Sequence, residues 1–178
     1  MIDTGLKGKT AIVTGINNPS GIGAAIAGAL AAQGVAVFGT FLRQPASDDV
    51  LREAAFGVGG EALYRALSAR DATEVVSAIR ATGGRIEAIE IDLADPAAAA
   101  TIFDRAEAAF GPAKILINNA AYSIPDSFLP DAAGAPSAGG IPIAEFGVGG
   151  HDRHFQVNVR AAMLLMRELF RRHIDRGG

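Results

Sequence analysis

The sequence contains no cysteine and no tryptophan, and its aromatic content is only 6%. Without cysteine the chain cannot form disulfides, thiolate zinc sites or a cysteine nucleophile, and the cytoplasm is the expected compartment. No basic cluster accompanies the net charge of -3, so we expect no surface for nucleic acid or for an anionic membrane. No apolar run approaches the ~20 residues that span a bilayer, and we expect no targeting segment.

Apolar runs alternate with helical patterns along the 178 residues, of which 49% are hydrophobic. This length and composition suit one globular domain, expected to span residues 1–178. Four strands and the main helices are predicted, in chain order, at residues 9–14, 22–33, 35–41, 72–81, 85–91, 96–110, 114–118 and 152–172. The weaker pattern at 43–72 predicts an insertion with short helices at 50–56 and 61–68. The alternation predicts an α/β fold with a doubly wound parallel sheet.

Three details sharpen this prediction. Asp95 is expected to cap the helix that follows, with Pro96 at its first position. The strand at 114–118 is apolar on both faces, so we expect it inside the sheet and not at an edge. The segment 123–150, rich in glycine, proline and alanine, is either a functional lid or disordered, and we expect a mobile loop on the substrate side.

The segment Thr14–Gly23, with the sequence TGINNPSGIG, stands between the first predicted strand and the helix after it. Glycines at this place let the backbone turn sharply and approach a pyrophosphate, and the helix start supplies unpaired N–H groups. A pair of glycines alone is more often an ordinary turn. The strand before it and the helix after it favour dinucleotide binding.

The residues after the second predicted strand, Gly39–Arg43, include an arginine and no carboxylate. In dinucleotide sites a carboxylate at this place binds the ribose 2′-hydroxyl of NAD, whereas an arginine accommodates the 2′-phosphate of NADP. Arg43 therefore favours NADP over NAD. The alternative is that Arg43 is an ordinary surface residue of a loop.

These features resemble the short-chain dehydrogenase/reductase family and are similar, within it, to the 3-oxoacyl-[acyl carrier protein] reductases. Three further motifs match in order and separation: Asp92-Leu93, NNAA at 118–121 and VNV at 157–159. The match covers almost the whole chain. Two departures are local, because five residues rather than three separate Gly15 from Gly21, and the family's NNAG ends here in Ala121.

The resemblance implies a Rossmann-type sheet of strand order 3-2-1-4 and a role for each matching position. The phosphate-side turn corresponds to Gly15, Gly21, Ile22 and Gly23, the adenine contacts to Asp92 and Leu93, the wall beside the nicotinamide ribose to Asn119 and Ala120, and the catalytic asparagine of a proton relay to Asn158. The implied reaction is hydride transfer between NADP(H), or NAD(H), and a small-molecule ketone or alcohol or a 3-oxoacyl thioester.

Some of these residues also have a purely structural interpretation. Asp92 could cap a helix, although Asp95 suits that role better. Asn118 is expected to bind backbone groups of neighbouring strands, which is the alternative for Asn119 as well. Asn158 could simply be a polar residue on a helix.

The catalytic residues that the resemblance implies are missing, namely a tyrosine acid, a lysine four residues after it and a serine. The only tyrosines are Tyr64 and Tyr122, followed four residues later by Ser68 and Asp126, and no lysine follows Lys114. The chain therefore resembles the cofactor-binding part of the family, cut before the fifth strand, and is expected to lack ordinary reductase activity. The rival hypothesis is a catalytically inactive nucleotide-binding or interaction module produced by truncation.

The last predicted helix has one apolar face, with Phe155, Val159, Met163, Met166 and Phe170. Together with Leu164 and Leu165 its methionines are expected in the core and in a subunit interface, because family members associate through this helix into homo-oligomers. His151 and His154 have no third ligand at a recognisable spacing, so we expect solvated histidines and no metal site. No Gly-x-Ser-x-Gly elbow supports a hydrolase.

Overall fold

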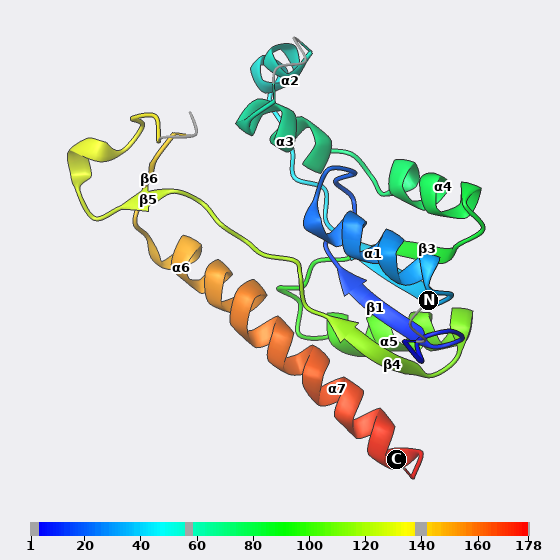
Figure 1. Cartoon of the computed structure of the whole chain (residues 1–178). Helices are drawn as coiled ribbons and strands as arrows, with labels where there is room; N and C mark the ends of the chain where they lie inside the picture. The colour runs from blue at the N-terminus through cyan, green and yellow to red at the C-terminus, as the bar shows by residue number, and fades with distance from the viewer. Residues whose placement is uncertain (1–3, 56–58, 138–141, 178) are drawn as a thin grey trace.

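The computed structural model describes residues 4–55, 59–137 and 142–177. At its centre lies a parallel 4-stranded sheet of order β3-β2-β1-β4 (Figure 1). Its strands are β1 (Thr10–Thr14), β2 (Ala36–Phe41), β3 (Arg85–Glu90) and β4 (Ala113–Ile117). All of β1 is buried because it has a strand on each side and helices on both faces. The predicted α/β class and the strand order 3-2-1-4 are confirmed.

Helices cover both faces of the sheet (Figure 1). One face carries α1 (Ile22–Ala32) and α4 (Thr73–Ala81), and the other carries α5 (Ala98–Phe110) and α7 (Ala162–Asp175). Successive side chains of a strand point to opposite faces. Accordingly, Ala11 and Val13 of β1 join the core under α1 and α4, whereas Ile12 joins the core under α5 and α7.

The insertion between β2 and α4 forms the two short helices predicted there, α2 (Asp48–Ala54) and α3 (Glu61–Ser68). The hydroxyl of Ser47 caps α2 by accepting a hydrogen bond from the N–H of Val50. α3 buries Ala66 and Leu67. The bounds predicted for α3 are confirmed. α2 begins two residues before the predicted start at residue 50, and residue 56, the predicted end, lies outside the described residues.

The segment after β4 contains more regular structure than the loop that we predicted. β5 (Asp126–Ser127) and β6 (Ala144–Glu145) pair in parallel, and the 3-10 helix η1 (Pro130–Ala132) lies between them in sequence. α6 (Val148–Phe155), the π-helical turn η2 (Gln156–Ala161) and α7 then follow without a break and form a helical arm, visible in orange and red in Figure 1. The arm begins at Val148 and not at residue 152.

Two local predictions were wrong. β4 lies at an edge of the described sheet and not in its interior, and of its residues only Ala113 is buried. An apolar strand sequence indicates that helices cover both faces of the strand. It does not indicate whether a further strand pairs with its edge. α5 begins at Ala98, because the carboxylate of Asp95 accepts from the N–H of Ala97 at 2.8 Å in a turn that precedes the helix.

The apolar stripe of the helical arm faces away from the core. Phe155, Met163 and Phe170 are 55%, 61% and 62% exposed, whereas Leu165 is 2% exposed and packs under the sheet. The expected core role therefore holds for Leu165 and for the partly buried Leu164, and it is wrong for the two methionines. Within the described residues, no helix combines the length and the apolar character that a membrane crossing requires.

Candidate functional site

The glycine turn, Thr14–Gly23, joins the carboxyl end of β1 to α1. Gly15 has φ of +77°, which is unfavourable for any residue with a Cβ. A Cβ on Gly23 would lie 2.1 Å from the carbonyl oxygen of Gly15 and 2.5 Å from Nδ2 of Asn119. The turn is therefore so tight that both positions require glycine.

The first turn of α1 presents N–H groups that no side chain caps. Gly21 is the N-cap residue and makes no side-chain cap, and the first helical turn has no acidic residue. The side chain of Ile22, beside these groups, is exposed. Unpaired N–H groups and the positive end of the helix dipole attract an anion, so this place fits a pyrophosphate.

Thr14 and Asn119 tie the end of β1 to the residues that follow β4. Oγ1 of Thr14 accepts from the N–H groups of Asn119 (3.0 Å) and Ala120 (2.9 Å). Nδ2 of Asn119 donates to the carbonyl oxygens of Thr14 (2.8 Å) and Gly15 (3.0 Å). The structural role that we expected at Asn118 thus falls to Asn119, and Asn119 and Ala120 border the glycine turn.

Asn17 and Asn18 of the glycine turn bind the insertion, a contact that the sequence did not reveal. Nδ2 of Asn17 donates to the carbonyl oxygens of Ser68 and Arg70, both at 2.9 Å. Nδ2 of Asn18 donates to Oγ of Ser68 at 3.4 Å, and both asparagines are buried. No local pattern could show this contact, because Asn17 and Ser68 are 51 residues apart in sequence.

Arg43 follows β2 and forms an ion pair with Glu90 at the end of β3. Nη2 of Arg43 lies 2.8 Å from Oε2 of Glu90. The side-chain hydrogen bond between them raises the pKa of Arg43 and lowers the pKa of Glu90, so both groups remain charged. Arg43 is exposed, as the surface alternative required, but it is held in place at the edge where the nucleotide ribose is expected.

Asp92 and Leu93 follow β3 on the same edge of the sheet. The carboxylate of Asp92 accepts from the N–H of Ala94 at 2.9 Å and pairs with Arg153 of the helical arm at 2.9 Å. Asp92 does not cap α5, whose N-cap is Ala97. Leu93 is half-buried against the core beneath the sheet. Both residues thus lie where open α/β sheets bind ligands.

Asn158 lies within the π-helical turn of the helical arm. Its Oδ1 accepts from the N–H of Tyr122 at 2.8 Å, and its Nδ2 donates to the carbonyl oxygen of Tyr122 at 2.9 Å. Asn158 is therefore more than a polar helix residue, since it fixes the main chain just beyond NNAA. π-helical turns often mark functional positions, although the sequence carried no signal for this one.

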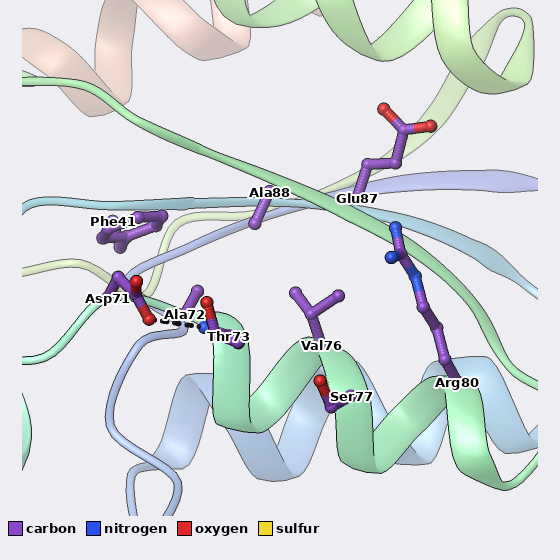
Figure 2. Close-up of a pocket in the computed structure, with 9 residues that line it drawn as sticks. All are labelled: Phe41, Asp71, Ala72, Thr73, Val76, Ser77, Arg80, Glu87 and Ala88. Carbon is purple, nitrogen blue, oxygen red and sulfur yellow. Dashed lines mark hydrogen bonds between the residues drawn. The ribbon is translucent and has the colours of Figure 1, made fainter.

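An open groove of about 390 Å³ runs between α4 and β3 (Figure 2). Val76 and Arg80 of α4 point toward β3, and Phe41 and Asp71 form the end of the groove next to the carboxyl end of β2. The N–H of Thr73 donates to Asp71 and lowers the pKa of its carboxyl. The groove therefore ends beside the Arg43 and Glu90 pair.

Two histidines of the helical arm, His151 and His154, take part in ring contacts. His151 packs between Phe146 and Phe155, with ring centroids 6.0 Å and 4.8 Å apart, and His154 lies edge-on to Tyr122 at 5.0 Å. Among the residues that the structure describes, no group of three or more His, Cys, Asp or Glu side chains could hold a metal ion.

Comparison with known proteins identifies related chains. The family model for short chain dehydrogenases matches residues 55–178. An uncharacterized oxidoreductase of Bacillus subtilis is 32% identical over 164 residues, which cover 92% of this chain and 50% of that protein. The chain therefore spans about half the length of the curated relatives that it matches.

Solved structures show the same likeness. A short chain dehydrogenase from Burkholderia cenocepacia in complex with NADP has a TM-score of 0.64 and 32% identity, with 93% of this chain and 51% of that one covered. A 3-oxoacyl (acyl-carrier-protein) reductase from Agrobacterium tumefaciens with NADP bound has a TM-score of 0.65 and 25% identity, with 99% and 52% covered.

Proposed function

Since the chain belongs to the short-chain dehydrogenase/reductase family, we propose that it forms the nucleotide-binding part of an NADP(H)-dependent oxidoreductase. The observation that carries this proposal is the uncapped start of α1 beside a turn that admits only glycine at Gly15 and Gly23. When bound, the nicotinamide cofactor supplies or accepts the hydride. The substrate is a ketone or alcohol, or a 3-oxoacyl thioester as the likeness to the Agrobacterium reductase suggests.

The proposed contacts follow the order of residues along the sheet edge. The pyrophosphate is held by Gly15, Gly21, Ile22 and Gly23, the 2′-phosphate by Arg43, the adenine by Asp92 and Leu93, and the nicotinamide ribose by Asn119 and Ala120. Asn158 is the proposed asparagine of the proton relay, and its side chain fixes the segment that starts at Tyr122. The apolar stripe of the helical arm supports a homo-oligomer, and the composition supports a cytoplasmic protein.

A catalytically inactive nucleotide-binding or interaction module is the second candidate. It is favoured by a specific observation, since neither Tyr64 nor Tyr122 has a lysine four residues later. Both candidates require nucleotide binding at the glycine turn. They differ in catalysis: the oxidoreductase should turn over a ketone or a thioester, whereas the inactive module should turn over none.

Calorimetric titration of the purified chain with NADPH tests the nucleotide site. Gly23→Ala should weaken NADPH binding more than tenfold, because its Cβ would overlap the carbonyl oxygen of Gly15 at 2.1 Å. Gly28→Ala is the matched control on the same helix, since a Cβ there has no atom within 4 Å. If the wild-type chain binds neither NADPH nor NADH, the proposal is wrong.

The assignment of NADP rests on Arg43 and has its own test. Arg43→Glu should weaken NADPH binding much more than NADH binding, because only NADPH carries a 2′-phosphate. An equal loss for both dinucleotides would remove the preference for NADP.

A further inference from the structure

The pairing of Arg43 with Glu90 leaves one edge of the guanidinium unused. Oε1 of Glu90 accepts from both the main-chain N–H (3.1 Å) and Nε (3.0 Å) of Arg43, and Oε2 lies 2.8 Å from Nη2. Glu90 therefore occupies the Nε side of a rigid fork of N–H donors. In the part of the chain that the structure describes, Nη1 has no hydrogen-bond partner. This free edge leaves N–H donors of Arg43 available to a second anion.

The charges beside this edge weaken its attraction for anions. Glu90 neutralises Arg43 at 2.8 Å. The hydrogen bond with Glu90 is the main cause that raises the pKa of Arg43, and the charge of nearby Asp71 adds to it. A 2′-phosphate, with about two negative charges, meets one arginine and two carboxylates here. A ribose 2′-hydroxyl is neutral and can donate to a carboxylate.

We propose that Glu90 reduces the preference of this chain for NADP(H) over NAD(H). It is a positioning residue that holds Arg43 ready for a 2′-phosphate, and its own charge limits how tightly that phosphate binds. NADP(H) is therefore preferred over NAD(H) by less than Arg43 alone would give. The inference rests on the proposed nucleotide site and adds to it a residue that lies outside the motifs described above.

Two small nucleotides isolate the effect, because adenosine 2′,5′-bisphosphate differs from adenosine 5′-monophosphate only in its 2′-phosphate. Their dissociation constants are measured by calorimetry for the wild type and for Glu90→Gln. The variant should raise the preference for the bisphosphate about tenfold, since it removes a charge while its amide oxygen still accepts from Arg43. Glu90→Ala should raise the preference less, because Arg43 then loses its support.

Glu87→Gln is the matched control, because Glu87 is exposed on the same strand and the change removes the same charge. An unchanged preference in Glu90→Gln, or an equal rise in Glu87→Gln, would overturn the role of Glu90. Failure of the wild type to bind either nucleotide would instead count against the proposed function. Thermal unfolding checks that each variant folds. If Glu90→Gln does not fold, Glu90→Ala tests the same prediction, because it should also raise the preference for the bisphosphate.

Discussion

The glycine turn and the helical arm differ in where their side chains find partners. Thr14 is fully buried and bonded at the turn, and Asn17 and Asn18 are buried with hydrogen bonds to the insertion. On the arm, Met163 and Phe170 are apolar and exposed. The glycine turn is therefore specified by contacts within the described part of the chain. The apolar stripe is exposed in that part, and it is suited to contacts with another chain.

The largest effect on stability is expected at the turn, with Thr14→Val. Valine keeps the shape of threonine but leaves the N–H groups of Asn119 and Ala120 without their acceptor. We expect a loss of about 3 kcal/mol in the free energy of unfolding, measured by denaturant titration.

Thr10→Val provides the control for Thr14→Val. Thr10 is equally buried on the same strand, but its hydroxyl only donates to the carbonyl oxygen of Phe110, at 3.0 Å. Its loss should be about 1 kcal/mol. Equal losses in the free energy of unfolding would mean that the hydrogen bonds between Thr14 and the residues after β4 add no more stability than an ordinary hydroxyl hydrogen bond.

On the inward face of the helical arm, as at the glycine turn, loss of a buried hydrogen-bonding group should reduce the free energy of unfolding. Glu168 is buried and accepts from Arg171 at 2.6 Å and from Arg172 at 2.8 Å, and Arg172 also pairs with Glu107 of α5. Glu168→Gln should cost about 2 kcal/mol of stability. Asp175→Asn, which weakens an exposed pair with Arg171, should change stability by less than about 0.5 kcal/mol.

The contribution of the buried Glu168 carboxylate to stability should depend on pH. The hydrogen bond from Arg171 is the main cause that lowers the pKa of Glu168 in the folded chain. Its contribution is thus complete above the ordinary glutamate pKa of about 4.3 and is lost as the pH falls below that value. Unfolding midpoints measured through this range should fall more steeply for the wild type than for Glu168→Gln. Parallel curves would contradict the assignment.

The smallest effect on stability is expected on the outer face of the arm. Met163→Lys should change the free energy of unfolding by less than about 0.5 kcal/mol, because the side chain is exposed. It should nevertheless reduce self-association, measured by light scattering over a range of concentrations. Ala29→Lys, at an exposed position of α1, should not. A wild-type chain that stays monomeric would remove the interface role of the stripe.

The sequence was most informative where structure depends on near neighbours. β1 and α1 follow from a β-branched run, a glycine turn and small residues at helical spacing, and the structure places them within a residue of the prediction. The two short helices of the insertion were also predicted, because short-range helical patterns fix them.

The remaining features depend on residues that are distant in sequence. Glu90 gave no sign that it would hold Arg43, because the two are 47 residues apart and meet only when β2 pairs with β3. The edge position of β4 could not be inferred from an apolar run, since burial by helices produces the same run. The π-helical turn at Asn158 has no sequence signal.

Because the glycine turn and the insertion contact each other, the two segments form one unit that has to be transferred as a whole. If the insertion were deleted, the buried amides of Asn17 and Asn18 would lose their acceptors at Ser68 and Arg70. A longer turn without its insertion therefore leaves unsatisfied donors, and a grafted insertion without the longer turn lacks its anchor. A chimaera that aims to transplant either segment has to move both.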